Sequence, residues 1–270
     1  MRVITRSPFP AVVERQGRPA DTRLDADAPA TPHAGVHQGE PSVADPLFYV
    51  VEIDLPAEDP GRDLAIFRAW YANVHAPHLY EAGFTTCSSY RGISGAMQIV
   101  DIYQAPDWSL FQSESFARYR RIAAADPHLP AFMPAIPNIR TPYVHSDRGR
   151  EAAGAPLATD WITLWRLDAD EALTARLADW LDTEGRGWLH AHGIDRVRIL
   201  RRTRPAPTGT SNRPPAALVL ESSRRPPGEI IDASAAPAFL GAANGAAPHF
   251  CGYRLYPWPD DADLMPGRIT

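Results

Sequence analysis

Two histidines three residues apart are the first groups in this sequence that could move protons. His75 and His78 lie near the end of a segment with helical periodicity, so they share one helix face. An imidazole titrates near neutral pH, which suits a general acid or base. Two imidazoles could instead ligate a metal ion, but HxxH without a third ligand is a weak signal, and we predict no metal site. In the remaining interpretation one histidine hydrogen-bonds the helix end and the other is exposed.

Asp101 lies within the otherwise apolar segment IVDIYQ. A carboxylate there is desolvated, which raises its pKa unless the group is paired, and enzymes tune bases in this way. Strand alternation places Ile99, Asp101 and Tyr103 on one face. Asp101 and Tyr103 therefore join the two histidines as candidate catalytic residues. The alternative for Asp101 is a structural ion pair with Arg91 on the preceding strand.

Tyr71, Tyr80, Tyr90 and Glu52 are candidates for binding a substrate. A phenol can donate a hydrogen bond to a carbonyl or phenolate, although amphipathic packing explains a tyrosine equally simply. Glu52 shares a strand face with Asp54, where it lies either at a rim or in a cavity. The seven tryptophans of the chain supply aromatic surface that suits an apolar pocket for a ring compound, or a packed core.

The elements that must position these groups follow a β-α-β-β-α-β order, the ferredoxin-like arrangement. We expect Pro77 to break or kink the first helix, Gly83 to close it, and Asp107 to cap the second. The predicted strands are 48–56, 84–92, 96–104 and 139–145, and the helices are 59–83 and 105–125.

The same order returns later in the chain. Trp70 precedes Gly83 by thirteen residues, and Trp180 precedes Gly193 by the same interval. The predicted strands of this second copy are 160–168, 194–202, 216–223 and 249–259, and its helices are 169–193 and 228–242.

We therefore predict an α+β protein of two tandem ferredoxin-like units, at 46–147 and 157–259, behind a disordered or extended tail at 1–45. Each unit leaves one sheet face bare, and two sheets meeting face to face bury it, which gives an intrachain α/β-barrel pseudo-dimer. The second copy has Gly185 and Trp188 where the first has its two histidines. A functional site is therefore expected in the first unit.

The segment FRAWYANVHAPHLYEAGFTTCSSYR resembles the signature region of the dimeric α/β-barrel superfamily, in the form WY…H.P.L…GF…RY. The resemblance covers most of residues 46–145, extends weakly over 157–259, and excludes 1–45. It implies the fold and leaves the activity open among polyketide cyclases, muconolactone isomerase-like enzymes, cofactor-free monooxygenases, haem-binding proteins and stress proteins. Gln104 departs from the pattern, since an acid usually follows the strand tyrosine. The matching positions are Trp70, Tyr71, His75, Pro77, Leu79, Gly83, Phe84, Tyr90 and Arg91.

Composition excludes several function classes. The 27 basic residues are all arginine, so lysine Schiff-base chemistry, lysine-anchored pyridoxal phosphate and a P-loop are absent. The net charge of −5 gives no reason to expect nucleic-acid binding. No apolar run approaches the ~20 residues of a membrane span, and no signal peptide is visible. With only two distant cysteines, a reducing cytoplasm fits best.

The leading hypothesis is an enzyme without an organic cofactor that transfers protons on an aromatic or polyketide-like substrate, as a cyclase, isomerase or lyase. His75 or His78 would be the base, and a tyrosine hydroxyl would steady the developing oxyanion. The alternatives are a cofactor-free monooxygenase and a non-catalytic binding or stress-associated protein. Haem, with either histidine as axial ligand, is a minor option. The expected partner is a small apolar or aromatic molecule, and a homodimer of pseudo-dimers is left open.

Overall fold

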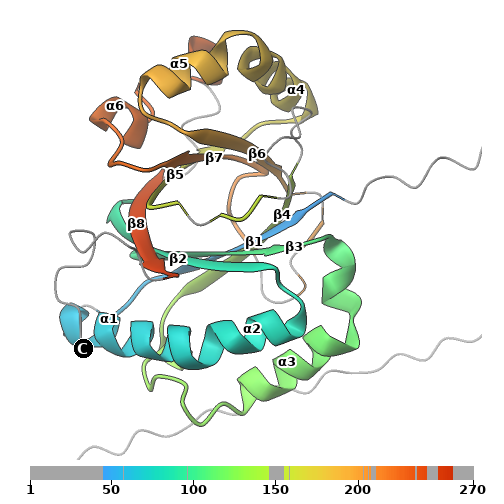
Figure 1. Ribbon diagram of the computed structural model, residues 1–270, viewed down its shortest axis with the longest axis vertical. Helices are drawn as coiled ribbons and strands as arrows, with labels where there is room; N and C mark the ends of the chain where they lie inside the picture. The colour runs from blue at the N-terminus through green and yellow to red at the C-terminus, as the bar shows by residue number, and fades with distance from the viewer. Residues whose placement is uncertain are drawn as a thin grey trace, which may run out of the picture. The chain divides into compact units, whose positions relative to one another are not determined.

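A computed structural model gives the fold as α+β, as expected, with helices packed outside a barrel of strands (Figure 1). The predicted tail, residues 1–45, lies outside the described residues apart from Asp45. The structure describes residues 45–56, 58–95, 97–145, 155–157, 159–202, 204–205, 207, 211–234, 236–241 and 249–257.

The first half of the barrel and its helices follow the predicted order. The strands are β1 (Leu47–Ile53), β2 (Thr86–Ser94), β3 (Ile99–Ala105) and β4 (Asn138–His145). The helices are α1 (Pro60–Trp70), the π-helical turn η1 (Tyr71–His75), α2 (Ala76–Ala82), the 3-10 turns η2 (Trp108–Gln112) and η3 (Met133–Ala135), and α3 (Glu114–Ala124).

The second half repeats this order with shorter helices after its third strand. The strands are β5 (Trp161–Leu167), β6 (Arg196–Arg201), β7 (Ala216–Ser222) and β8 (Phe250–Tyr256). The helices are α4 (Glu171–Trp180), the π-helical turn η4 (Leu181–Gly185), α5 (Arg186–Ala191), α6 (Gly228–Ile231) and the 3-10 turn η5 (Ala238–Leu240).

Strand order is the same in both halves. The first runs β4-β1-β3-β2 and the second β8-β5-β7-β6, with every pairing antiparallel. The two sheets were expected to face each other in an α/β barrel, and the structure joins their edges at the β2–β8 and β4–β6 seams into one closed barrel. Joining the edges satisfies backbone groups that two open sheets would leave unpaired.

The barrel interior is filled by side chains from both halves, so it is a core and not a cavity. One buried cluster combines Phe48, Val100 and Ile102 with Leu164 and Val219 from the second half. Two further clusters lie between the outer sheet faces and the helices, one in each half. The burial of two bare sheet faces against each other is therefore confirmed, and it leaves the outer faces as the places where a pocket can form.

A π-helical turn follows the first helix of each half at the same place. Pro77 was expected to break or kink its helix, but it lies in the first turn of α2, directly after η1, and the helix continues. Gly83 ends the helix in a left-handed conformation with φ +108°, and Gly193 does so in the second half with φ +79°. The interval between tryptophan and glycine in the sequence thus corresponds to the same local structure.

The cap of the second helix differs from the prediction. Asp107 accepts a hydrogen bond from the Ser109 amide and caps only the short turn η2. Ser113 caps α3 by accepting from the Phe116 amide. The segment 105–125 is therefore two helical pieces, because each piece has its own capping side chain.

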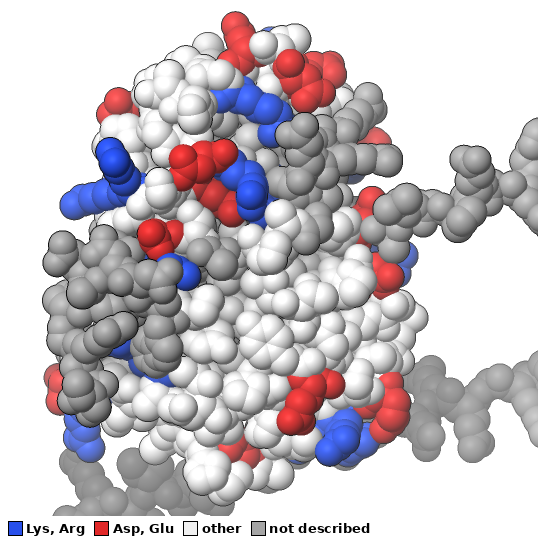
Figure 2. Space-filling view, in the orientation of Figure 1, with Lys and Arg blue, Asp and Glu red and all other residues white. Residues whose placement is uncertain are grey.

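The face of the molecule in Figure 2 carries basic and acidic side chains close to one another, with no continuous basic stripe among the described residues. Its central area is uncharged. None of the helices in the described ranges has the length and apolar run needed to cross a bilayer.

Candidate functional site

A cavity of about 470 Å³ lies between the outer face of the first-half sheet and its helices. Strands β1, β3 and β4 form its floor, and η1, α2, α3 and η3 supply its walls. Its lining is mostly apolar and aromatic, with polar groups at His75, His78, Asp101, Tyr103, Arg120 and Arg140. All four residues predicted to be catalytic line this one cavity, two from η1 and α2 and two from β3, and the packing of the helices on the sheet brings the two pairs together.

His75 is held by aromatic rings at the end of η1. Its ring stacks on Trp70 with centroids 4.5 Å apart, and the rings of Tyr71 and Tyr119 lie within 5.6 and 6.1 Å. Trp70 is fixed in turn, because its indole N–H donates to Asp126 Oδ2 at 2.8 Å. A ring packed in this way has one orientation, which a proton-transfer group requires.

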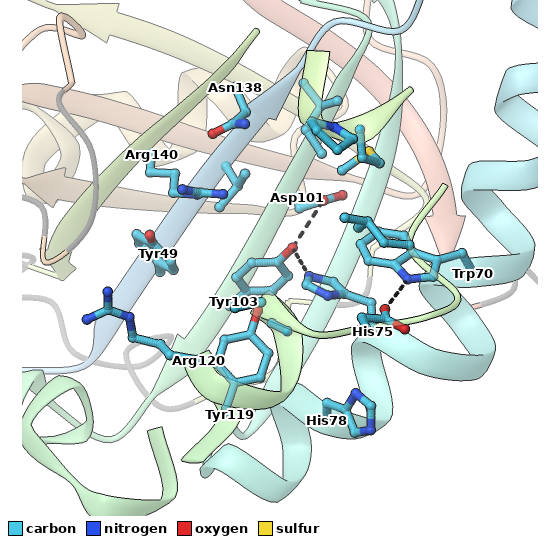
Figure 3. Close-up of a pocket in the computed structure, with 18 of the residues that line it drawn as sticks. Tyr49, Trp70, His75, His78, Asp101, Tyr103, Tyr119, Arg120, Asn138 and Arg140 are labelled. Atoms are coloured by element: carbon cyan, nitrogen blue, oxygen red, sulfur yellow. Dashed lines mark hydrogen bonds between the residues drawn. The ribbon is translucent and has the colours of Figure 1, made fainter. Parts of the chain in front are cut away.

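Three polar groups form a chain across the floor of the cavity (Figure 3). Tyr103 donates its hydroxyl hydrogen to Asp101 Oδ2 at 3.1 Å, and the same hydroxyl oxygen lies 3.4 Å from His75 Nε2. All three line the cavity, but Asp101 and Tyr103 are buried, whereas His75 is half-buried and is the most accessible of the three to a ligand. The sequence placed Ile99, Asp101 and Tyr103 on one face, and this alternation is confirmed.

Burial sets the charge state of each member of this chain. Desolvation lowers the pKa of His75 to about 3, and the positive charge of Arg140 adds to this, so the imidazole is neutral at pH 7. Desolvation and the neighbouring Asp101 raise the pKa of Tyr103 well above its usual range, so the phenol keeps its proton. Desolvation raises the pKa of Asp101 to about 7, against hydrogen bonds from Ser89 and Tyr103 that lower it. Asp101 is thus the group of the three that titrates near neutrality.

The raised pKa of Asp101 predicts a pH-dependent stability. The unfolded carboxyl ionises near pH 4, but the folded one keeps its proton to about pH 7, so ionisation weakens the fold as pH rises through that window. Replacing Asp101 with Asn should therefore raise the thermal midpoint at about pH 8, by on the order of 5 °C, and should raise it far less at about pH 4. Thermal melts of both proteins at the two pH values measure this. An equal effect at both would show that Asp101 is not protonated in the fold.

The other predicted residues lie in different places. His78 lines the same cavity one turn further along, away from Asp101 (Figure 3). Tyr71 is buried beside His75 and Tyr103, behind the cavity wall. Tyr80 is 42% exposed on the surface, and its hydroxyl accepts from the Cys87 amide.

Glu52 and Tyr90 face the barrel interior, on the opposite side of the sheet from the cavity. Glu52 is buried and forms ion pairs with Arg166 and Arg213 at 2.9 and 2.6 Å. Tyr90 belongs to the interior core. The proposed pairing of Asp101 with Arg91 is wrong, because the Arg91 guanidinium donates to Gln98 Oε1 at 2.7 Å and Asp101 accepts from a tyrosine.

Several cavity residues were not identified from the sequence. Arg120 and Arg140 line the cavity from α3 and β4, and Tyr119 and Asp126 complete that wall. Trp70 had been noted as a repeat marker and as a position of the family resemblance, but not as a residue of the site. Trp70 and His75 are five residues apart, a spacing that a regular α-helix puts on different faces, and the π-helical turn η1 brings their rings together, so helical spacing gave no signal for this contact.

In the second half, the ring of Trp180 occupies the space that corresponds to the His75 side chain. A side chain at Gly185 would place its Cβ within 2.6 Å of the Trp180 ring, so the indole lies where a residue at this position would project. The outer face of β7 presents Ala216, Leu218 and Leu220 to the helices, without a carboxylate or phenol. The chain of polar groups therefore has no equivalent there.

Nowhere in the described ranges do three or more His, Cys, Asp or Glu side chains gather as a metal site would need. Gln104, which replaces an expected acid, has a structural role. Its amide accepts from the Leu157 N–H at 2.6 Å and donates to the Ala155 carbonyl at 3.0 Å, which fixes the connection between the halves.

Comparison with known proteins finds similar solved structures but no similar family model or curated sequence. No family model and no curated protein matches the sequence. A haem-binding protein from Thermus thermophilus is 13% identical, with a TM-score of 0.47 over 78% of this chain and 91% of that one. An anthrone oxidase-like protein is 11% identical, with a TM-score of 0.47 over 78% and 91%. A mutant chlorite dismutase from Candidatus Nitrospira defluvii is 11% identical, with a TM-score of 0.46 over 79% and 92%. Similarities this low do not identify an activity.

Proposed function

We propose that this protein is an enzyme that transfers protons on an aromatic or polyketide-like substrate without an organic cofactor, as an isomerase, cyclase or lyase. The observation that carries the proposal is the chain of His75, Tyr103 and Asp101 at one end of an aromatic cavity. The first half would be a ferredoxin-like repeat that kept this site, and the second a repeat that lost it. The shared strand order and paired π-helical turns support a duplication.

The pKa values favour a relay over a simple imidazole base. A group with a pKa of about 3 holds a proton weakly, so a lasting imidazolium at His75 is unfavourable. With Asp101 ionised, Tyr103 donates to it and His75 Nε2–H donates to the Tyr103 oxygen. Nδ1 of His75 then accepts a proton from the substrate while Nε2–H passes its proton to Tyr103, and Tyr103 passes its own to Asp101. The proton comes to rest on a carboxyl with a pKa of about 7, near the working pH.

The bond changes are those of enolisation. The C–H bond beside a carbonyl breaks, its electron pair forms the enolate, and the proton enters the relay. Tyr119 points its hydroxyl into the cavity and stays protonated, because burial raises its pKa, so it can donate to the enolate oxygen (Figure 3). Return of the proton at another carbon gives an isomer. Attack of the enolate carbon on a second carbonyl of the same molecule closes a ring, and the alkoxide formed from that carbonyl takes back the proton held by the relay.

Exchange of substrate hydrogen with solvent tests this function directly. Incubated in D2O with a panel of fused-ring aryl ketones, such as α-tetralone and its carboxylic acids, the protein should speed loss of the signal of the hydrogen beside the carbonyl in proton NMR. Wild-type protein denatured by heat is the control. Exchange at the buffer rate for every ketone would favour the non-catalytic binding hypothesis.

A cofactor-free monooxygenase would share the first step, because the same carbanion could react with dioxygen. Dioxygen uptake coupled to substrate loss would select this alternative, whereas exchange without uptake selects isomerase or cyclase chemistry.

Haem does not fit the cavity with His75 as its axial ligand. His75 Nε2, the nitrogen that faces the cavity floor, lies 3.4 Å from the Tyr103 hydroxyl, and Trp70 covers one ring face. A porphyrin bound to that nitrogen would have to displace Tyr103. His78 lies away from the polar chain, so a haem bound there would leave the chain unused. No step of the proposed reaction passes through haem.

A further inference from the structure

The cavity has two cationic side chains on the side opposite the polar chain. Arg140 on β4 and Arg120 on α3 lie across the cavity from His75 and Trp70 (Figure 3). Within the described part of the chain, neither guanidinium forms an ion pair. Arg140 is half-buried, whereas Arg120 is exposed. The half-buried guanidinium of Arg140 gains most from an anion that also enters the cavity.

The carboxylates that line the cavity are bound to other groups. Asp126 accepts from the Trp70 indole and from the His128 amide, both at 2.8 Å. Asp101 accepts from Tyr103. The cationic side of the cavity is therefore available to a ligand.

Strand register places this side at a defined spacing from the polar chain. On β1, Val51 pairs with Asp101 of β3 on one side and with Arg140 of β4 on the other. Directly paired residues point to the same face of a sheet, so these three side chains form a row across the cavity floor. Two strand spacings separate the ends of the row, about 10 Å between their backbones. A single fused-ring molecule lying on Val51 spans that distance.

We propose that Arg140, assisted by Arg120 at the mouth, binds a carboxylate of the substrate, which is therefore an aromatic carboxylic acid whose reacting C–H lies about one ring away from that group. This inference rests on the proposed function for the reacting end and on the register of β1 with β4 for the binding end. The planar guanidinium donates two parallel hydrogen bonds to a carboxylate, which fixes the orientation of the attached ring and neutralises the charge. His75, at the far side, then meets the opposite edge of the ring.

Binding of naphthoate and of naphthamide tests the inference without catalysis. The two probes have nearly the same shape and differ in charge, and quenching of tryptophan fluorescence follows both, since Trp70 lines the cavity. Wild-type protein should bind naphthoate ~10-fold more tightly than naphthamide, as expected for a hydrogen-bonded charge pair. Arg140→Gln should remove this preference by weakening naphthoate alone, and Arg140→Lys should keep part of it.

Arg121 is the matched control, because it lies one residue from Arg120 on α3, is exposed, and pairs with Glu114 outside the cavity. Arg121→Gln should leave both affinities unchanged. Naphthamide affinity in each variant reports an intact cavity. Equal binding of the two probes by the wild type, binding of neither at millimolar concentration, or an equal loss of both in Arg140→Gln would overturn the inference.

The outcome is separable from that of the proposed function. His75→Ala should keep the preference for naphthoate while losing hydrogen exchange. A preference for the acid without exchange on any ketone would leave the carboxylate site standing and reject the proton-transfer function. Hydrogen exchange without a preference for naphthoate would support the proton-transfer function and reject the carboxylate site.

Discussion

Replacing His75 with alanine should lower the rate of substrate turnover, or of hydrogen exchange on a ketone, by ~10²–10⁴-fold. Asp101 and Tyr103 are buried, so the half-buried imidazole is the member of the polar chain through which the proposed relay takes a proton from the cavity. Tyr103 and Asp101 would remain in place, because their own hydrogen bond does not involve the imidazole. The fold should therefore persist, which circular dichroism and the thermal midpoint would show.

His190→Ala is the matched control. His190 lies on α5, in the corresponding helix of the second half, and is exposed. Its replacement should change the rate less than two-fold, within the range that surface substitutions usually show. Comparable losses in the two variants, or an unchanged rate in His75→Ala, would reject His75 as the group that contacts the substrate. A loss confined to His78→Ala would move the base to the rim of the cavity.

Sequence periodicity was sufficient for the parts of the site that lie within one element. Alternation along one strand placed Asp101 and Tyr103 together, and helical spacing placed His75 near the end of a helix. Both periodicities are local and are set by backbone geometry. The repeat of Trp70 and Gly83 in the second half likewise reflects one local structure occurring twice.

Residues that come together through strand register could not be predicted. Arg140 lies in the cavity opposite the polar chain only because β4 pairs with β1 in one particular register, and a shift of one residue would turn it to the barrel interior. The same uncertainty affected Glu52. Its neighbour Val51, and not Glu52 itself, pairs with Asp101, so Glu52 faces the barrel. A single sequence does not show the register in which two strands pair.

Closure of the barrel also depends on long-range pairing. Among the described residues, the β4–β6 seam has two residue pairs, Val144 with Arg201 and His145 with Leu200. Such a short contact has no periodic signal in the sequence. It nevertheless joins the two halves, and with the β2–β8 seam it leaves the outer sheet faces as the surfaces that helices cover.

Glu52 links the two halves inside the barrel by charge. Its carboxylate accepts from Arg213 Nε at 2.9 and 3.0 Å and lies 2.9 Å from the Arg166 guanidinium, which comes from β5. Desolvation lowers the pKa of Arg166, and the charge of Glu52 is the largest influence that opposes this. The carboxylate therefore compensates two cations that have left water.

Replacing Glu52 with glutamine should lower the free energy of unfolding by about 3–5 kcal/mol, the usual cost of leaving a buried charge without its partner. The amide has nearly the same shape, so the loss reports charge and not a cavity. For a protein of this size the thermal midpoint should fall by about 10 °C or more. Urea unfolding and thermal melts measure both quantities. Asp54→Asn is the control, since Asp54 is half-buried next to the same strand and its side chain has no hydrogen bond or ion pair among the described residues.

Glu52→Gln also tests whether the barrel interior and the cavity are independent of each other. Glu52 lies on the opposite face of β1 from Val51, so at temperatures below both midpoints Glu52→Gln should bind naphthoate as the wild type does. Removing one member of a buried ionic cluster is costly even where the complete cluster contributes little, because the remaining cations keep their desolvation penalty. A stability loss below about 1 kcal/mol would show that water or other groups compensate Arg166 and Arg213. A large loss with unchanged binding would instead establish Glu52 as the residue that holds the two halves together, and would remove it from the substrate-binding set.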